Sequence, residues 1–222
     1  MTAWSYSSIK LFDQCPKKFY HLKVAKDVAD EAGPEADYGT KVHEAAELYV
    51  KDGTPIPEQF AYMRPIVEPI AAAPGTKFTE MKLGVTKTDA GFAPCGFFDK
   101  NVWYRGIVDV AVVNGRKARL VDYKTGKSKY ADTKQLDLMA GALFVHFPEV
   151  RVVKSALAFV VANDFIPKTH ERQHLDKYMG VFDTQLDRLE AAHESGVWNP
   201  NPGPLCGWCP VTSCEHWRPK RR

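Results

Sequence analysis

The feature that most restricts how this chain can fold is a pair of β-rich runs joined by Asn114-Gly115. The runs cover residues 102–113 and 117–124 and are dominated by β-branched and aromatic residues, which favour strands. Asn-Gly is the preferred dipeptide of a two-residue hairpin turn, because both positions tolerate a positive φ. We therefore predict an antiparallel hairpin at the centre of the fold.

The predicted hairpin also places its charged residues. With Asn114-Gly115 as the turn, the register puts Asp109 opposite Leu120 and Ile107 opposite Asp122. Side chains two apart along a strand share a face, so Asp109, Asp122 and Lys124 project from the same side. The two aspartates become diagonal neighbours with backbones about 7–8 Å apart. At that separation two carboxylates can bind one cation between them.

A carboxylate pair beside a lysine suits phosphodiester hydrolysis. A cation such as Mg²⁺ or Mn²⁺ lowers the pKa of an attacking water and neutralises charge that grows on the phosphate. Lys124 can add positive charge at the phosphate or orient the water. The competing interpretation is a solvent-exposed ion pair between Asp122 and Lys124, which is common on hairpins.

The segments around the hairpin alternate between helical and strand patterns. Apolar residues recur at helical spacing in five segments and alternate, or form a short apolar run, in two others. The predicted helices cover residues 9–20 with a kink or restart at Pro16, 39–50, 57–74 with interruptions at Pro65 and Pro69, 133–145 and 178–189. The predicted strands cover 77–85 and 155–161. Strands that are flanked and interrupted by helices indicate the α/β or α+β class.

Length and composition indicate one folded domain with appendages. The chain has 222 residues, of which 45% are hydrophobic and 26% charged, and its net charge of +3 does not by itself predict a nucleic-acid partner. No apolar run is long enough for a membrane span, and residues 1–10 lack a secretory pattern, so we expect a protein of the cytosol. We predict four parts: an N-terminal helical part (1–75), a catalytic sheet core (76–165), a C-terminal helix (166–198), and a cysteine cluster with a basic tail (199–222).

Three of the five cysteines lie close together near the C-terminus. Cys206, Cys209 and Cys214 form C-x₂-C-x₄-C, a spacing that lets thiolates converge on one metal centre. The fourth ligand could be Cys15, near the N-terminus, or His216. Cys15 would complete a Cys₄ set suited to a [4Fe–4S] cluster, whereas His216 would complete a Cys₃His zinc site. Either centre would contribute to folding.

A series of short motifs occurs along the chain in a recognisable order. These are Gly39-Thr-Lys-Val-His43, Glu80, Gly106-Ile-Val-Asp109, Asp122-Tyr-Lys-Thr-Gly126 and Gln135-Leu136. In this order the chain resembles the RecB-like branch of the PD-(D/E)xK nucleases from about Trp4 to Trp217. The resemblance implies a restriction-endonuclease-like core, in which a mixed central sheet is flanked by helices.

The resemblance also implies roles for individual residues. His43, Asp109, Asp122 and the Tyr123 carbonyl would bind Mg²⁺ or Mn²⁺, and Glu80 occupies an acidic position near the metals. Lys124 would be the catalytic lysine, and Gln135 would support the site. Family members commonly carry a tyrosine four residues after the glutamine, but this chain has Met139 there, so the contact of that hydroxyl is not expected.

The cysteines resemble those of one branch of the family. In RecB-like nucleases with an iron–sulfur cluster, including AddB-type and CRISPR adaptation nucleases, one N-terminal cysteine joins three at the C-terminus. By this resemblance Cys15, Cys206, Cys209 and Cys214 would bind a [4Fe–4S] cluster that joins the two ends of the chain. Zinc held by the three C-terminal cysteines and His216 is the alternative.

The function expected from these features is metal-dependent hydrolysis of DNA. The RecB-like branch mostly processes DNA ends, so an exonuclease acting on single- or double-stranded ends in recombination, repair or phage DNA metabolism is favoured, alone or with repair proteins. The sequence predicts neither the polarity of cleavage nor the oligomeric state. The rival is a non-catalytic DNA-binding or scaffold protein, against which Asp109, Asp122 and Lys124 argue.

Overall fold

In the computed structural model of this chain, residues 3–29 and 33–218 are described. They form two compact units. One unit contains the described residues up to 29 and those from Phe182 onward, and the other is Gly33–Val181. This division does not test the predicted single domain of four parts, which stays a prediction. The basic residues 220–222 of the predicted tail lie outside the described residues.

The Gly33–Val181 unit is built on a six-stranded mixed sheet, which confirms the predicted fold class. The strand order is β2-β1-β3-β4-β5-β6, and all neighbours are antiparallel except β4 and β5, which are parallel. The strands are β1 (Thr76–Thr88), β2 (Gly91–Cys95), β3 (Tyr104–Asn114), β4 (Lys117–Lys124), β5 (Val152–Phe159) and β6 (Asp164–Glu171).

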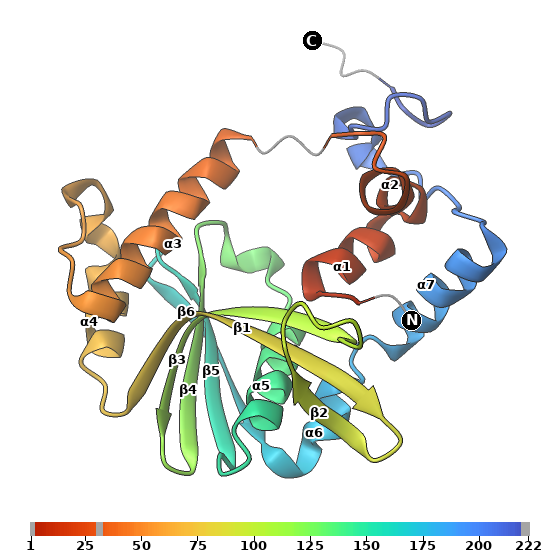
Figure 1. The fold of residues 1–222 in the computed structure, drawn as a ribbon. Coiled ribbons are helices and arrows are strands. Elements are labelled where there is room, and N and C mark those ends of the chain that lie inside the picture. The colour runs from red at the N-terminus through yellow and green to blue at the C-terminus, as the bar shows by residue number, and fades with distance from the viewer. Residues whose placement is uncertain (1–2, 30–32, 219–222) are drawn as a thin grey trace. The chain divides into compact units, whose positions relative to one another are not determined.

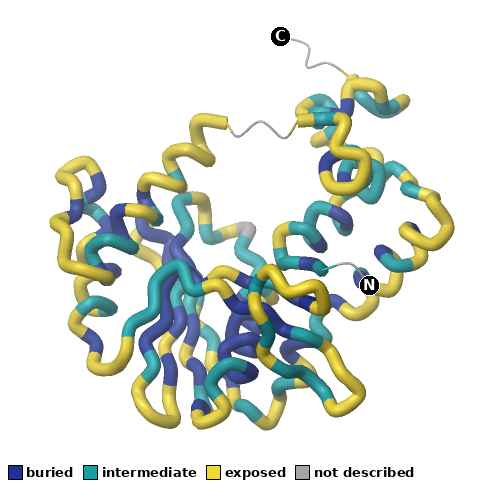
Figure 2. Tube along the Cα trace, in the orientation of Figure 1, coloured by how far each residue is buried: buried dark blue, intermediate teal, exposed yellow. Residues whose placement is uncertain are grey.

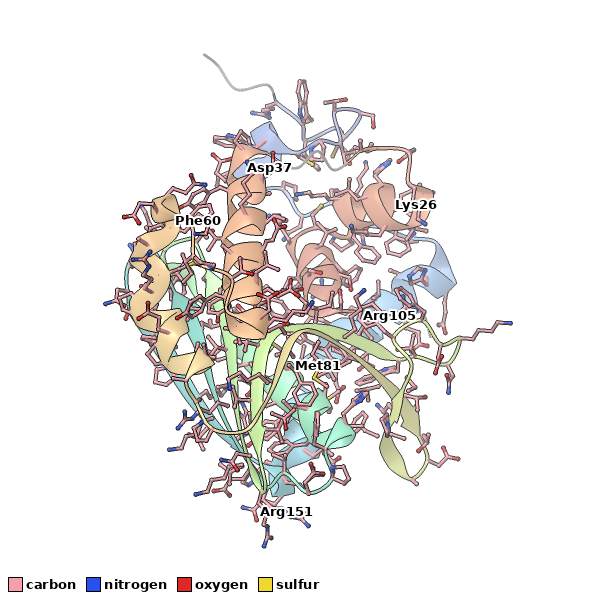
Figure 3. All side chains as sticks on the ribbon, turned by 60° about the vertical axis from the view of Figure 1, so that its left-hand side comes forward. Lys26, Asp37, Phe60, Met81, Arg105 and Arg151 are labelled. Carbon is pink, nitrogen blue, oxygen red and sulfur yellow. The ribbon has the colours of Figure 1, made fainter. Side chains whose placement is uncertain are left out.

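Helices cover both faces of this sheet (Figure 1). On one side lie α3 (Pro34–Asp52), the 3₁₀ helix η2 (Glu58–Met63) and α4 (Arg64–Ala71), which share a core with Val110 and Tyr123 of the sheet. On the other side α5 (Lys134–His146) is buried along most of its length, as the dark tube in Figure 2 shows. Figure 3 adds the side chains to the ribbon and labels Phe60 in η2 and Met81 in β1.

The hairpin between β3 and β4 forms as predicted, but its turn is shifted by one residue. Asn114 pairs with Lys117, so Gly115 and Arg116 are the turn residues, and Ala111 pairs with Leu120. Gly115 has a φ of 55°, whereas Arg116 is not among the residues with positive φ. A turn that needs positive φ only at its first central residue accepts Gly there and an L-residue next.

The predicted pairing of Asp109 with Leu120 and of Ile107 with Asp122 is therefore wrong. The shift moves each partner by two positions, so the shared face of Asp109, Asp122 and Lys124 is unchanged. Continued by one step past the Val110–Val121 pair, the observed register sets Asp109 directly across from Asp122 rather than diagonal to it.

The region predicted as a C-terminal helix over 166–198 is also different. It begins with β6, an edge strand whose side chains are mostly exposed, so it lacks an apolar signal. A short 3₁₀ helix, η4 (Arg172–His174), follows, and then two helices, α6 (Leu175–Met179) and α7 (Asp183–Ser195), separated by a turn over residues 180–182. Strand β2 was not predicted either.

The other unit combines helices from both ends of the chain. It contains α1 (Tyr6–Gln14), α2 (Pro16–Phe19), the π-helix η1 (Tyr20–Ala25), α7 and the 3₁₀ helix η5 (Pro204–Trp208). Ser5 and Ser8 form a capping box at the start of α1. Trp198 stacks on Phe19, with ring centroids 5.9 Å apart, and meets Phe12 edge-on. This aromatic packing fixes the chain after α7 against the N-terminal helices. No helix among the described residues is long and apolar enough to span a membrane.

Candidate active site and cysteine cavity

The candidate active site lies where β3 and β4 separate. Their pairing ends at Val110 and Val121; beyond this point β3 stays paired with β1, and β4 stays paired with β5. The Asp109 carboxylate fills the resulting gap, because the Tyr123 backbone N–H donates to Asp109 Oδ2 at 2.7 Å. A side chain thus replaces the backbone acceptor that β3 would otherwise supply.

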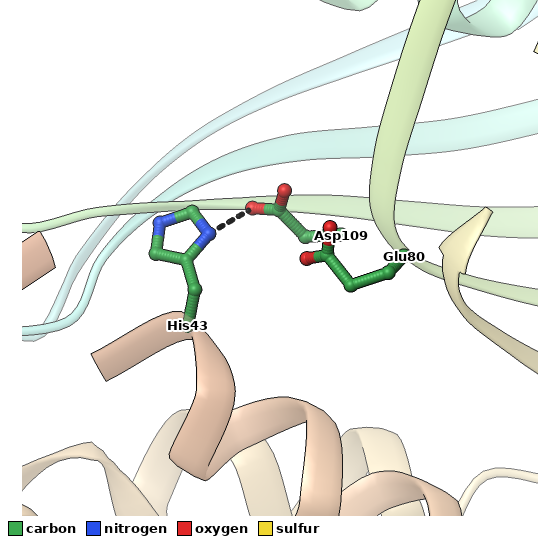
Figure 4. Close-up of side chains that lie close together, drawn as sticks. All are labelled: His43, Glu80 and Asp109. Carbon is green, nitrogen blue, oxygen red and sulfur yellow. Dashed lines mark ion pairs between the residues drawn. The ribbon is translucent and has the colours of Figure 1, made fainter. Parts of the chain in front are cut away.

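Helix α3 brings His43 to the same carboxylate. His43 Nδ1 lies 3.3 Å from Asp109 Oδ2, as the dashed line in Figure 4 shows. Glu80 of β1 approaches Asp109 from the other side in the same view. One ligand atom from each of His43, Glu80 and Asp109 lies within 4.8 Å of the others. Three elements far apart in the sequence therefore present a nitrogen and two carboxylates to one point.

Glu80 reaches this point through an unusual backbone conformation. Its φ is 45°, in the left-handed region that side-chain-bearing residues rarely adopt. The pairing of β1 with β3 continues through Thr79–Val110 and Met81–Val108, but Glu80 and Asp109 between them are not a paired position. Such strain costs of order 1–3 kcal/mol and persists only where the surroundings enforce it.

Asp122 and its partners form the other half of the site. The Asp122 side chain is almost fully buried, and its Oδ1 accepts a hydrogen bond from Gln135 Nε2 of α5 at 2.6 Å. Its Oδ2 forms an ion pair with Lys124 Nζ. Lys124 remains about one-third exposed and can reach both the carboxylate and solvent.

The electrostatics of the site follow from burial and from like charges in proximity. Burial, together with the charge of Asp109, raises the pKa of Asp122 to about 6, although Lys124 opposes this shift. Burial and the charge of Asp109 also raise the pKa of Glu80. Burial lowers the pKa of His43, but its hydrogen bond to Asp109 and the nearby carboxylates outweigh that effect and raise it. The site thus carries more negative charge than its own cations neutralise.

This arrangement fits a divalent cation with oxygen and imidazole ligands. Mg²⁺ and Mn²⁺ prefer carboxylate and carbonyl oxygens, and Mn²⁺ also accepts imidazole. The ligand atoms of His43, Glu80 and Asp109 already converge, and a cation there would offset the repulsion that raises the pKa of Asp122 and of Glu80.

All predicted residues of this site lie in the Gly33–Val181 unit, but they are not all in direct contact. The structure brings His43, Glu80 and Asp109 together, and joins Asp122 to both Lys124 and Gln135. The left-handed conformation of Glu80 had no signal in the sequence, because its neighbours read as an ordinary alternating strand. Met139, in the place of the family tyrosine, is buried in α5.

The four predicted cysteine ligands line one small cavity in the other unit. Its walls include Cys15, at the start of α2, and Cys206, Cys209 and Cys214 from the C-terminal segment, and its volume is about 30 Å³. His216 lines the same cavity, so both candidates for a fourth ligand are present. Cys95 lies on β2, in the Gly33–Val181 unit.

Backbone N–H groups point at two of the sulfur atoms. Asn201 N–H donates to Cys15 Sγ at 3.4 Å, and Gly203 N–H donates to Cys206 Sγ at 3.3 Å. Lys17 also lines the cavity and forms an ion pair with Glu215. Within the described part of the chain, no three cysteines have sulfur atoms all within 4.8 Å of one another.

The comparison with protein families gives one match, which covers nearly the whole chain. A model described as the PD-(D/E)XK nuclease superfamily matches residues 3–214. No curated protein sequence matches the chain.

Two solved structures that resemble this chain share little sequence with it. A protein from Eubacterium rectale named "Putative exonuclease" is 12% identical, with a TM-score of 0.54 over 98% of this chain and 89% of that protein. A protein named SSO0001 is also 12% identical, with a TM-score of 0.49 over 98% of this chain and 88% of its own.

Proposed function

Because the chain belongs to the PD-(D/E)XK nuclease superfamily, we propose that its candidate active site hydrolyses phosphodiester bonds of DNA in a Mg²⁺- or Mn²⁺-dependent reaction. The observation that carries this proposal is the convergence of His43, Glu80 and Asp109 beside the buried Asp122–Lys124 pair. A site of this kind, at the edge where two strands part, is open to a phosphate on one side and held by three elements on the other.

In the proposed reaction His43, Asp109, Asp122 and Glu80 hold the cation, with the Tyr123 carbonyl as a further ligand. A strand residue's N–H and C=O face the same neighbouring strand. Since Tyr123 N–H donates to Asp109, its carbonyl faces the same gap. When bound, the cation supplies an activated water and neutralises charge on the phosphate.

The remaining residues act on the water and on the carboxylates. Lys124 Nζ lies at the carboxylate of Asp122, from which it can orient the attacking water and stabilise negative charge on the scissile phosphate. Gln135 donates to Asp122 Oδ1 and so fixes the direction of the other oxygen.

One assay tests this function. End-labelled single- and double-stranded DNA is incubated with Mg²⁺ or Mn²⁺ and with wild type, Asp122→Ala or Lys124→Ala. Lys154→Ala, at an exposed lysine of β5, is the matched control. We expect both site variants to lose at least about 100-fold in rate and the control to cut like wild type. Equal cutting by all four proteins would mean that Asp122 and Lys124 do not carry the activity, and no cutting by wild type would favour a non-catalytic DNA-binding role.

We further propose that the reaction is exonucleolytic and acts at DNA ends during recombination, repair or phage DNA metabolism. The structural neighbour from Eubacterium rectale supports the fold, and its name, "Putative exonuclease", agrees with this activity. A covalently closed single-stranded circle and its linear form separate the alternatives, because an exonuclease degrades the linear form alone.

For the cysteine cavity we propose a [4Fe–4S] cluster bound by Cys15, Cys206, Cys209 and Cys214. The shared cavity and the two N–H···S contacts support thiolate ligands, since such hydrogen bonds are typical around cluster sulfurs. Zinc bound by Cys206, Cys209, Cys214 and His216 is the alternative, because His216 lines the same cavity.

Metal analysis of anaerobically purified protein tests the cluster. Four irons and four sulfides per chain, both lost in Cys15→Ser and retained in Cys95→Ser, are expected. One zinc per chain that survives Cys15→Ser but not His216→Ala would favour the Cys₃His alternative.

A further inference from the structure

A strip of aromatic and basic side chains extends from the candidate active site along β1 and β3. We call Lys82, Arg105, Phe97 and Phe98 the aromatic–basic strip. Lys82 pairs with Ile107 and Gly84 pairs with Arg105, and partners in an antiparallel pair share a face, as do residues two apart. Lys82, Ile107 and Arg105 therefore lie on one face of the β1–β3 pair.

The loop after β2 folds over this face. A Cβ on Gly84 would lie 2.7 Å from the carbonyl oxygens of Cys95 and Gly96, so only a glycine lets the loop cross there. The loop is closed by Asp99, whose Oδ2 accepts a hydrogen bond from Gly96 N–H at 2.6 Å. The loop thereby places Phe97 beside Arg105 and Phe98 beside Lys82.

Each phenylalanine is matched to one cation. Lys82 Nζ lies 5.8 Å from the ring centroid of Phe98, and the Arg105 guanidinium carbon lies 5.7 Å from that of Phe97. Neither cation forms an ion pair within residues 3–29 and 33–218, and Arg105 Nε is buried without a hydrogen-bond partner there. Two positive charges are thus held by aromatic rings and remain available to an anion.

Phe98 is the exposed end of this arrangement. Its relative exposure of 76% is the highest among the large hydrophobic residues of the described chain. The loop that carries it is fixed at Gly84 and Asp99, so the ring is presented on a defined support. An exposed ring on a fixed loop, with Lys82 beside it, can stack on a flat ring of a partner that also carries negative charge.

The strip is continuous with the candidate active site. Ile107, between Asp109 and Arg105 on β3, lines the same pocket as His43 and Glu80 and is 39% exposed. With about 3.3 Å per strand residue, Lys82 lies about 7 Å along β1 from Glu80, and Arg105 lies about 13 Å along β3 from Asp109. These distances span the first few nucleotides of a strand whose scissile phosphate is at the metal ligands.

We infer that the aromatic–basic strip binds the unpaired strand that enters the active site, with Lys82 and Arg105 at its phosphates and Phe98 stacked on a base. This inference rests on the proposed function, and it names single-stranded DNA as the preferred substrate. Stacking requires a free base face, which duplex DNA offers only at its terminus, whereas every nucleotide of a single strand offers one.

Binding without cleavage tests the strip independently of catalysis. Fluorescence anisotropy is measured in EDTA with a labelled oligothymidylate and with a blunt hairpin duplex of equal charge. The variants are Phe98→Ala, Phe98→Tyr and Lys82→Gln. The controls, Phe165→Ala and Lys154→Gln, change an exposed phenylalanine of β6 and an exposed lysine of β5.

Phe98→Ala should weaken single-strand binding about 10-fold, leave duplex binding within twofold, and be rescued by tyrosine. Lys82→Gln should weaken binding and lower the salt dependence by about 0.7 in log–log slope, as loss of one phosphate contact requires. Unchanged single-strand affinity of Phe98→Ala, or an equal loss for duplex and for the controls, overturns the inference. If the wild type binds this way yet does not cut with Mg²⁺ or Mn²⁺, the proposed function fails and the strip stands.

Discussion

Asp122 is held as an anion where almost no water reaches it. Only 2% of the residue is exposed, and burial with the charge of Asp109 raises its pKa to about 6. A carboxyl group whose pKa is raised in the folded state stabilises the fold below its unfolded pKa, near 4. That contribution is lost as the pH rises through about 6. Above neutral pH the metal-free fold therefore carries a cost of order 2–3 kcal/mol at this one side chain.

Asp122→Asn should consequently stabilise the metal-free protein at alkaline pH. Asparagine keeps an acceptor for Gln135 but removes the buried charge, so we expect a gain of about 1–2 kcal/mol at pH 8 that vanishes near pH 4. Urea unfolding in EDTA across this pH range measures it. Asp187→Asn, at an exposed position of α7, is the control and should show no such trend. If Asp122→Asn is instead less stable than wild type at pH 8, Lys124 and Gln135 stabilise the Asp122 carboxylate sufficiently without metal.

His43 could be named as a ligand only through the family motif, because a lone histidine on a helix is usually a surface or packing residue. The structure adds its position, 3.3 Å from Asp109. Its ring also meets the Tyr123 ring edge-on, with centroids 6.0 Å apart. The contact with β4 that positions the imidazole therefore comes from a residue 80 positions away in the chain.

At the scale of elements, the conformation of β1 at Glu80 decides where a carboxylate points. Left-handed backbone costs a residue with a Cβ roughly 1–2 kcal/mol, whereas glycine adopts it freely. The strand pairs on both sides of Glu80 keep the same register and so enforce this conformation. The Glu80 carboxylate is therefore held in position by the β1–β3 pairing on both sides of it before any ligand binds.

The order of stability of glycine and alanine variants should therefore differ between Glu80 and its neighbour Met81. We expect Glu80→Gly to be more stable than Glu80→Ala by about 1 kcal/mol. At Met81, which has no positive φ, the glycine variant should be less stable than the alanine variant by about 0.5–1 kcal/mol. Thermal and urea unfolding of the four variants measures both differences. The same order at both positions would contradict a left-handed Glu80.

Helix α5 is held to the sheet by a second buried polar group. Asp137 Oδ1 lies 2.9 Å from His170 Nε2, and its Oδ2 accepts from Lys168 Nζ at 2.7 Å. Although burial opposes it, these partners lower the pKa of Asp137. Because Asp137 lies two residues after Gln135, this contact fixes the part of α5 that reaches Asp122.

Asp137→Ala should destabilise the fold by about 2–4 kcal/mol, because it leaves the fully buried His170 without its acceptor. With a lowered folded pKa, the stabilisation exists above the unfolded pKa and is lost as the pH falls through the folded value. The difference from wild type should therefore shrink in acid, which urea unfolding at pH 7 and pH 3.5 measures. A constant difference would mean that packing rather than charge holds α5.

At the scale of the whole molecule, residues from both ends of the chain meet in one unit. Asn201 links them directly, since its N–H donates to Cys15 Sγ and its side-chain amide donates to the Gln14 carbonyl at 3.0 Å. A metal centre that binds Cys15 together with C-terminal cysteines would close a loop of nearly the whole chain. In addition, its binding free energy would contribute to folding.

Cys15→Ser should thus loosen the C-terminal segment more than any other single cysteine change outside that segment. We expect chymotrypsin to cut after Trp208 or Trp217 at least several-fold faster than in wild type. Cys95→Ser, a substitution in the Gly33–Val181 unit, should leave the rate unchanged. Limited proteolysis of anaerobic samples followed by mass spectrometry measures both. Equal rates in the two variants would mean that Cys15 does not hold the segment.

The sequence by itself determined the parts of this protein that depend on local pattern. The β3–β4 hairpin, the helices around His43 and Gln135, the mixed α/β class and the shared face of Asp109 and Asp122 all follow from periodicity and turn chemistry. They could be predicted because each depends on residues within about fifteen positions of one another. The resemblance of the motifs to those of the RecB-like nucleases then indicated which residues form the active site.

Only the tertiary structure decided the geometry between distant segments. It shifted the turn to Gly115-Arg116, opened the sheet between β3 and β4, and turned Glu80 toward Asp109. It also replaced the predicted C-terminal helix with β6 and shorter helices. The physical reason is that each of these features depends on many contacts between residues that are far apart in the sequence. A local conformation that is unfavourable alone, such as that of Glu80, persists when the pairing around it leaves no alternative.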